Sequence, residues 1–259
     1  MQIQKINFEI ASLHLMRNYP KDLFYIGSTT LLKKPKIAIV GSRKPNQYAR
    51  ELTQTIASKL ANAGVVVVSG GAMGIDAVAH KAAGASNTIM VAGTGLDKRY
   101  PAVNKNLIAY IEQKGLVLSQ FEAGTPSQKY NFPLRNELVV ALGDALVVSY
   151  ADKNSGTMRS VEYALKMDKK IFVLPHRIGE SEATNELLEQ GLAEPIYDVD
   201  KFVACYGVSD VIPSQKDPFS EYCKTHPTYE EAIEKDAQKV FEYELAGKIR
   251  VESGVVYPV

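Results

Sequence analysis

Short apolar runs and helical segments alternate along the first part of the chain. Residues 36–40 and 65–68 are rich in valine and isoleucine, and between them apolar side chains recur every fourth position from Tyr48 to Leu60. That spacing predicts a helix over residues 46–63 with one apolar face, followed by a glycine at its carboxyl end. The run at 65–68 is apolar on both faces, which is typical of a parallel strand covered by helices on two sides.

The alternation continues to residue 174. Further apolar runs stand at 88–91, 116–119, 145–149 and 170–174, and helical segments separate them. Strands that alternate with helices indicate an α/β fold with a doubly wound, mostly parallel sheet. We therefore expect residues 36–206 to form a doubly wound α/β domain.

Loops rich in glycine or polar residues follow these strands, on the edge where doubly wound sheets bind ligands. They are 41–43, 69–76, 93–101, 129–136 and 152–157. Glycine lets the backbone approach a ligand, and the free N–H groups of a helix's first turn favour an anion such as phosphate. Neither glycine-rich turn matches G-x-x-x-x-G-K-[ST] or G-x-G-x-x-G, which argues against ATP and NAD. Glycines that only shape tight turns are the alternative.

A series of motifs occurs between residues 19 and 197. They are Gly41-Ser42-Arg43; Ser69-Gly70 with Gly74-Ile75-Asp76 and His80; Gly93-Thr94-Gly95-Leu96-Asp97 with Tyr100-Pro101 and Asn104; Phe132-Pro133-Leu134-Arg135-Asn136; Ser155-Gly156-Thr157; and Thr184-Asn185 with Gly191. In content and order they resemble the motifs of the DNA-processing protein A family, also called DprA or Smf. Met73 and His176 depart from the family pattern, in which many relatives carry a basic residue and a glycine at these two positions.

The resemblance implies a function and a set of partners. It implies an extended Rossmann-like domain that binds single-stranded DNA, forms a homodimer, protects incoming DNA and loads the recombinase RecA during natural transformation. Double-stranded DNA is a further candidate ligand. The sequence offers no nucleophile with a matching base and no set of metal ligands, so no catalytic residue, cofactor or metal is expected. The resemblance suggests a bacterial source. The loops at Met73 and His176 are expected to hold DNA less strongly by charge.

The expected DNA contacts are cations, one aromatic ring and the backbone of the turns. They are Gly41, Ser42, Arg43, Gly70, Gly71, Lys129, Phe132, Arg135, Asn136, Ser155, Gly156, Thr157 and Lys166. Arg43 and the N–H groups of the glycine-rich turn would bind phosphates, and Phe132 would stack on a base of any kind. Two alternatives stay open: Phe132 as a core side chain, and Arg135 as a salt-bridge partner that fixes the loop.

Asp76 and His80 lie one helical turn apart and so on the same helical face. A carboxylate beside an imidazole suggests acid–base chemistry. An acidic residue in a first turn also interacts favourably with the helix dipole, however, and His80 could pair with it. We expect this structural role for both residues.

The nearest enzymatic alternative is a nucleotide phosphoribohydrolase of the lysine-decarboxylase-like group, which shares the fold type. That group carries a catalytic glutamate in a P-G-G-x-G-T-x-x-E loop. Here Gly156-Thr157 is followed by Met, Arg and Ser, so that Ser160 stands where the glutamate would be. Glu162 lies roughly 200° further around the helix at ~100° per residue. Hydrolysis is therefore disfavoured.

Composition is consistent with a globular protein of the cytoplasm. Of the 259 residues, 46% are hydrophobic, which is ample for a core. The two cysteines show neither metal nor disulfide spacing, no secretory leader opens the chain, and no apolar run approaches the ~18 residues of a membrane span.

The net charge of +1 is the sum of two parts of the chain whose net charges have opposite sign. Residues 1–206 carry 24 basic and 19 acidic side chains, a net +5, and residues 207–259 carry 6 and 10, a net −4. Tight binding of phosphates by the second part is not expected, because phosphate affinity comes mainly from neutralising cations. A protein-interaction or regulatory role suits it better.

Segments outside the Rossmann-like domain complete the expected organisation. Residues 1–35 are a reduced N-terminal segment, with Tyr19-Pro20 and Leu23 packing on the main domain, and residues 207–217 are a linker. Residues 218–259 predict a small winged-helix-like domain, with a capping box at Thr228-x-x-Glu231, an amphipathic helix that ends at Gly247, and a hairpin. The apolar side of that helix is expected to hold Ile233, Ala237, Val240, Phe241 and Leu245.

Overall fold

The predicted apolar runs form the central strands of one sheet in the computed structural model, which describes residues 2–207, 218–245, 249–252 and 254–258. These strands are β3 (Lys36–Val40), β4 (Val66–Ser69), β5 (Thr88–Val91), β6 (Leu116–Ser119), β7 (Ala145–Val148) and β8 (Ile171–Val173). They lie in the order β6-β5-β4-β3-β7-β8, and all neighbours are parallel. The predicted α/β fold with a mostly parallel, doubly wound sheet is confirmed.

Short strands extend this sheet at both edges. They are β1 (Gln4–Lys5), β2 (Phe24–Gly27) and β9 (Glu194–Pro195). β2 pairs antiparallel with β6 and β1 antiparallel with β2, while β9 runs parallel to β8, so that the sheet has nine strands within the described residues. The N-terminal segment thus adds strands to the main sheet, and Leu23 is buried against it.

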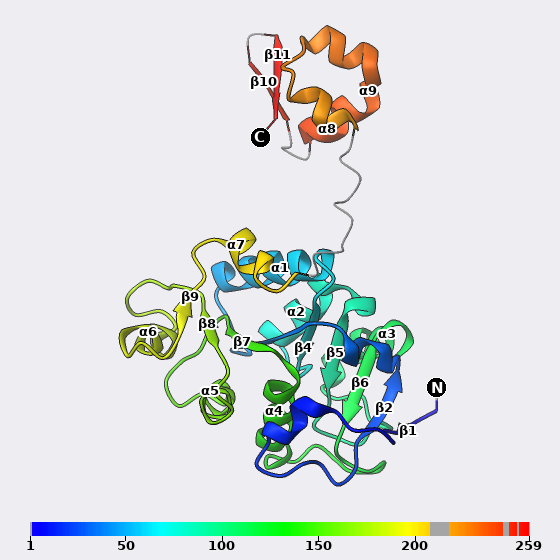
Figure 1. Ribbon diagram of the computed structural model, residues 1–259, viewed down its shortest axis with the longest axis vertical. Coiled ribbons are helices and arrows are strands. Elements are labelled where there is room, and N and C mark those ends of the chain that lie inside the picture. Colours follow the sequence, from blue (N-terminus) through cyan, green and yellow to red (C-terminus); the bar gives the residue numbers. More distant parts are fainter. Residues whose placement is uncertain (1, 208–217, 246–248, 253, 259) are drawn as a thin grey trace. The chain divides into compact units, whose positions relative to one another are not determined.

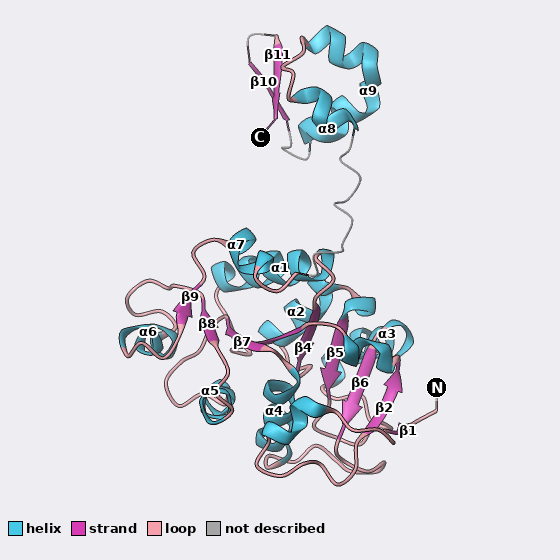
Figure 2. Cartoon of the chain, in the orientation of Figure 1, coloured by secondary structure: helices cyan, strands magenta, loops and turns pink. Residues whose placement is uncertain are grey.

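Helices cover both faces of the sheet (Figure 1, Figure 2). One face carries α1 (Gln47–Asn62), α2 (Ile75–Ala83) and α7 (Val199–Ala204), and the other carries α4 (Asn131–Leu142), α5 (Thr157–Lys166) and α6 (Glu182–Glu189). α3 (Lys105–Lys114) packs on β2, β5 and β6. Side chains of β3 alternate between the faces, since Ile37 and Ile39 pack with α1 and α2, whereas Ala38 and Val40 pack with α4 and α5. Short 3-10 helices complete this unit: η1 (Ala11–Leu15), η2 (Thr29–Lys33), η3 (Ala85–Asn87) and η4 (Ala102–Asn104).

The strand order reverses between β3 and β7. The chain leaves β3 through α1 towards β4 on one side, and β7 later returns to the other side of β3. In sheets of this kind, ligands bind outside the carboxyl ends of the strands at such a reversal. The loops that follow β3, β4, β5 and β7 all open on this edge, which we call the carboxyl edge.

The chain divides into two compact units, Met1–Val208 and Ser209–Val259. The second unit contains α8 (Pro218–Cys223), α9 (Tyr229–Leu245) and an antiparallel hairpin of β10 (Ile249–Glu252) and β11 (Val255–Pro258). The predicted hairpin is confirmed, while the winged-helix-like character of this unit stays a prediction. Most of the predicted linker, residues 208–217, and the expected helix end at Gly247 lie outside the described residues.

The capping box at the start of α9 is confirmed. The N–H of Glu231 donates to Thr228 Oγ1 at 3.3 Å, and the N–H of Thr228 donates to Glu231 Oε2 at 2.9 Å. The bond from the Thr228 N–H, with a second bond from the Thr228 hydroxyl at 2.9 Å, lowers the pKa of the Glu231 carboxyl group. The two reciprocal bonds satisfy groups that would otherwise lack a helical partner.

The predicted apolar face of α9 is wrong in part, because the helix is kinked. Asp236 has an extended backbone (φ −166, ψ 90), and its carboxylate accepts from the N–H of Lys239 at 3.0 Å, as an N-cap does. The helical phase restarts after this residue. Of the predicted face, Val240 is buried, whereas Ile233 before the kink and Phe241 after it are exposed.

In the part of the chain that the structure describes, no helix combines the length and the apolar character needed to cross a membrane.

Candidate nucleic-acid interface

The turns that follow β3 and β4 pack directly on each other at the carboxyl edge. The N–H of Ile75 donates to Ser42 O at 3.2 Å, and the N–H of Ser42 donates to Tyr150 O, in the loop after β7, at 2.9 Å. Gly74 has φ +78, and a Cβ on it would lie 2.3 Å from Ser42 O, so that only glycine fits there. At Gly74 the glycine therefore has a packing role, as the structural alternative expected. Gly41 and Ser42 lie half-buried in the same contact.

Phe132 stands half-buried at the carboxyl edge with a cation beside it. Its ring lies against Gly93, where an added Cβ would be 3.0 Å from the ring. The guanidinium carbon of the exposed Arg43 lies 5.9 Å from the ring centroid, within the range of a cation–π contact. Phe132 belongs to none of the buried hydrophobic clusters among the described residues. This placement leaves part of the ring accessible.

The backbone around Phe132 is helical rather than a loop. α4 begins at Asn131, which places Phe132, Arg135 and Asn136 in its first two turns. Pro133 is tolerated there because the first N–H groups of a helix have no helical partner. Phe132 and Arg135, three positions apart, therefore lie on one helical face.

Arg135 is buried, with 5% exposure, and forms an ion pair with Asp76. Its Nη1 lies 3.6 Å from Asp76 Oδ2, which also accepts from the N–H of Ala72 at 3.2 Å. Burial lowers the pKa of the Arg135 guanidinium and raises that of the Asp76 carboxyl group, and in each case the charge of the partner opposes the shift. The salt bridge that the sequence left as an alternative is present. The Nε of Arg135 has no hydrogen-bond partner among the described residues.

Arg135 and Arg43 also share a small pocket. The cavity is about 40 Å³, and it opens between the glycine-rich turn, the loop after β5 and α4. Its lining includes Gly70, Tyr100 and Phe132 together with the two arginines. Two guanidinium groups and two aromatic rings thus line one space. Asp76, the ion-pair partner of Arg135, lies beside it.

The expected pairing of His80 with Asp76 is wrong. His80 is buried, and its Nδ1 lies 2.6 Å from Thr88 Oγ1. Because the Thr88 hydroxyl donates its proton to Val67 O at 2.8 Å, His80 Nδ1 must carry a proton and act as the donor. Burial, with a smaller contribution from Arg135, lowers the pKa of His80 to about 3. His80 is therefore neutral and structural.

Asn131 and Asn104, which are not among the predicted DNA contacts, connect the loops of the carboxyl edge by hydrogen bonds. Asn131 is fully buried, and its Nδ2 donates to Gly93 O at 3.0 Å, which ties the first turn of α4 to the loop after β5. Asn104 Nδ2 donates to the carbonyls of Gly71 and Ala72 at 3.0 and 3.1 Å. Asn104 was visible in the motif series, whereas nothing in the sequence separates Asn131 from an ordinary residue at a helix start.

Further predicted contacts lie in the loop after β7 and at the start of α5. α5 begins at Thr157, which is buried, while Gly156 is exposed. Asn136 Nδ2 donates to Gly156 O at 3.5 Å, a weak bond that links the first turns of α4 and α5. The Oγ of Ser155 is buried and has no hydrogen-bond partner among the described residues. These four residues lie together at the carboxyl edge.

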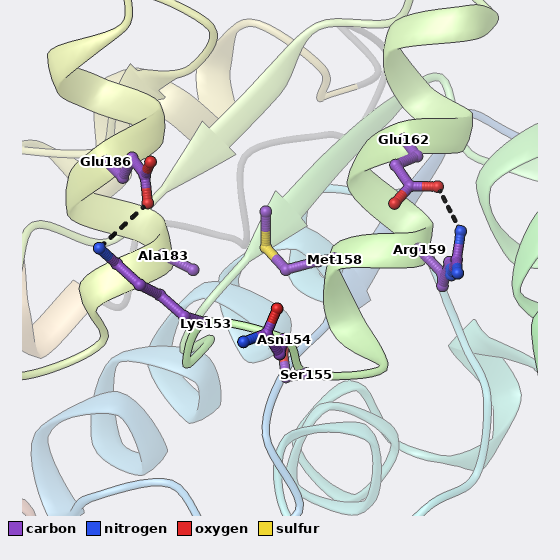
Figure 3. A pocket seen from close by; sticks show the side chains of 8 residues that line it. All are labelled: Lys153, Asn154, Ser155, Met158, Arg159, Glu162, Ala183 and Glu186. Carbon is purple, nitrogen blue, oxygen red and sulfur yellow. Dashed lines mark hydrogen bonds and ion pairs between the residues drawn. The ribbon is translucent and has the colours of Figure 1, made fainter.

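A wider pocket of about 450 Å³ opens between this loop, α5 and α6 (Figure 3). Its charged side chains are paired. Lys153 Nζ lies 3.5 Å from Glu186 Oε2, and Arg159 Nη1 lies 2.9 Å from Glu162 Oε2. The pocket therefore has no excess of positive charge from its side chains to attract a phosphate.

The two predicted lysines occupy different places. Lys129 is exposed and lies two residues before α4 begins, at the carboxyl edge. Lys166 is exposed in the last turn of α5. A helix of 10 residues spans about 15 Å at 1.5 Å per residue, so that Lys166 lies at the far end of α5 from Gly156. The structure brings Lys129 to the other predicted contacts and does not bring Lys166 there.

The position of the hydrolase glutamate is unsuited to catalysis. Ser160 is buried, with 1% exposure, and Glu162 is exposed and held by Arg159. Within the described ranges, no group of three or more histidine, cysteine, aspartate and glutamate side chains is arranged to hold a metal ion.

Several known proteins are similar in sequence to this chain. The family model of DNA recombination-mediator protein A matches residues 9–207. DNA processing protein DprA of Streptococcus pneumoniae is 39% identical over 176 residues, 66% of this chain and 62% of that protein. Protein Smf of Escherichia coli is 36% identical over 179 residues, 67% of this chain and 48% of that protein. The chain thus spans only about half to three fifths of the length of these curated relatives.

Two solved structures share the fold. DNA processing protein A from Helicobacter pylori, described for its single-stranded DNA binding mode, aligns with a TM-score of 0.77 and 40% identity over 79% of this chain and 95% of that chain. DNA processing protein A from Streptococcus pneumoniae aligns with a TM-score of 0.73 and 34% identity over 80% of this chain and 75% of that chain.

Proposed function

Because this chain belongs to the DNA recombination-mediator protein A family, we propose that it binds single-stranded DNA along the carboxyl edge of its sheet. The observation that carries the proposal is the position of Phe132, half-buried against Gly93 with Arg43 at 5.9 Å. An aromatic face beside an exposed cation is the combination that binds a base and its phosphate without regard to sequence.

Phosphate binding is assigned to the exposed cations and the turns. Arg43 and Lys129 are exposed at the carboxyl edge, and the exposed Gly156 stands at the start of α5, where backbone N–H groups favour an anion. Arg135 is buried and paired with Asp76, so its part is to hold the glycine-rich turn in shape and to add positive potential beneath the phosphate site.

The wider role follows the relatives and is also a proposal. The curated relatives are DNA processing proteins, and the Helicobacter pylori structure concerns single-stranded DNA binding. On that basis this protein acts as a homodimer in the cytoplasm, protects single-stranded DNA that enters during natural transformation, and delivers it to RecA. The net charge of −4 on residues 207–259 suits a contact with protein better than one with DNA.

We further propose that the protein works without chemistry on its ligand. The phosphoribohydrolase alternative requires a carboxylate at the position of Ser160, and the neighbouring Glu162 is exposed and occupied by Arg159. The protein is accordingly a binding module rather than a nucleotide hydrolase.

Titration of a fluorescently labelled oligothymidylate, with anisotropy as the readout, tests the function directly. We expect tight, salt-dependent binding of the single strand and weaker binding of a duplex of equal length. A chain that ends at Gly207 should keep this affinity, since the buried clusters that support the carboxyl edge use no residue beyond Tyr206. If the protein released free base from nucleoside monophosphates and did not bind the oligonucleotide, it would be a hydrolase and not a binding protein.

A further inference from the structure

Tyr100, in the loop after β5, lies beside Phe132 and remains 46% exposed. The two ring centroids are 6.0 Å apart, and the ring planes are inclined at 33°, so the rings are closer to parallel than to perpendicular. Tyr100 also lines the small pocket that contains Arg43 and Arg135. Among the described residues its hydroxyl group forms no hydrogen bond.

The fold does not need this ring to hold the loop in place. Other hydrogen bonds hold the loop, since the Gly95 N–H donates to Thr125 O at 3.0 Å and the Asp97 side chain accepts through Oδ1 from the Gly124 N–H at 2.8 Å. Asn104, at the end of the same loop, is anchored to Gly71. Tyr100 is thus a large, half-exposed aromatic side chain at the carboxyl edge that the packing of the loop does not require.

The spacing of the two rings suits an extended strand. Stacked bases in a duplex follow each other at ~3.4 Å along one strand. Two bases that stack on rings with centroids 6.0 Å apart cannot also stack fully on each other. A strand bound in this way must be unstacked, and duplex bases offer no free face for either ring.

We propose that Tyr100 is a second stacking platform, so that the carboxyl edge holds two neighbouring bases, one on Phe132 and the next on Tyr100. Arg43, whose guanidinium carbon lies 5.9 Å from the centroid of the Phe132 ring, meets the phosphate that accompanies the first base. The pair of rings makes the site selective for single strands over duplexes. This inference rests on the proposed function.

Substitution of Tyr100 separates stacking from other roles. Tyr100→Ala should weaken oligothymidylate binding at least about fivefold, because loss of one base–aromatic stack costs ~1 kcal/mol or more. The salt dependence should not change, since no phosphate contact is lost. Tyr100→Phe keeps the ring and should bind as the wild type does. Tyr110→Ala is the matched control, because Tyr110 is 54% exposed on α3 and does not line the pocket.

A strand without bases identifies what the ring contacts. On an abasic strand of equal length, the wild type and Tyr100→Ala should bind equally, because there is no base to stack. The chain contains no tryptophan, so Tyr100→Trp provides a unique indole whose fluorescence should be quenched by oligothymidylate and not by the abasic strand. Thermal denaturation of each variant verifies that it is folded.

The outcomes are distinct. An unchanged affinity in folded Tyr100→Ala, an equal loss on the abasic strand, or an unquenched Tyr100→Trp that still binds DNA would each overturn the role of Tyr100 and leave the proposed function in place. Failure of the wild type itself to bind the oligonucleotide would overturn the proposed function.

Discussion

The guanidinium of Arg135 lies in the space that any side chain on Gly70 would occupy. A Cβ on Gly70 would be 1.0 Å from Arg135 Nη1. The glycine-rich turn after β4 can therefore accept a side chain only if Arg135 moves away from Asp76. Gly70 belongs to a glycine-rich turn that resembles a phosphate-binding loop. It is here also required by the buried ion pair between Arg135 and Asp76.

Gly70→Ala should consequently destabilise the fold. Displacement of Arg135 leaves the Asp76 carboxylate buried without its partner, and breaking a buried ion pair costs up to about 3–5 kcal/mol. Gly156→Ala is the control, because Gly156 is exposed and an added Cβ would meet nothing within 4 Å. Urea denaturation of the two variants measures the difference. Equal free energies of unfolding would show that Arg135 relaxes without cost.

The sequence predicted the central sheet because its signal is local. Each strand from β3 to β8 is a run apolar on both faces, and the glycines and prolines between the runs mark the turns. β2 was not predicted, because it is a strand of only four residues, most of them half-buried or exposed, and it pairs antiparallel with β6.

The site was less predictable because it depends on contacts distant in sequence. Whether Arg135 faces solvent or Asp76 is decided by packing across 59 positions of the chain, and no local pattern reports it. Lys166 has the right charge and follows the right loop, but ten helical residues carry it away from the edge. A regular helical period predicts the apolar face of α9 only in part, since the kink at Asp236 interrupts that period.

Arg43→Ala should weaken single-strand binding for all base sequences alike. Arg43 is exposed at the carboxyl edge, and each lost phosphate contact lowers the slope of log K against log salt by about 0.7 for a single strand. Lys166→Ala removes an equal charge at the far end of α5 and should change neither affinity nor slope. Anisotropy titrations at several salt concentrations provide both quantities. An identical loss in the two variants would mean that only net charge matters.

Phe132→Ala should reduce DNA affinity more than stability. Stacking on one base contributes about 1–3 kcal/mol, and the ring lies outside the buried clusters of the described chain. Phe202→Ala is the contrasting variant, because Phe202 is 6% exposed within the core and its loss should cost about 3–5 kcal/mol of stability. Melting temperature and oligonucleotide affinity are measured for both. If Phe132→Ala melted at as low a temperature as Phe202→Ala, the Phe132 ring would instead be part of the core.

Acid should destabilise the fold through His80. Folding lowers the pKa of this group from 6.5 to about 3, so between these values the unfolded chain binds a proton that the folded chain excludes. Stability therefore falls as the pH decreases through this window, by at most about 1.4 kcal/mol per pH unit from this residue. His80→Asn retains a donor towards Thr88 and cannot be protonated. Arg135 and Asp76, which also lie near, remain in the variant and affect both proteins alike. The free energy of unfolding of the wild type should drop by about 2 kcal/mol more than that of His80→Asn between pH of about 6.5 and about 5, and parallel pH profiles would show that His80 is not the group that titrates.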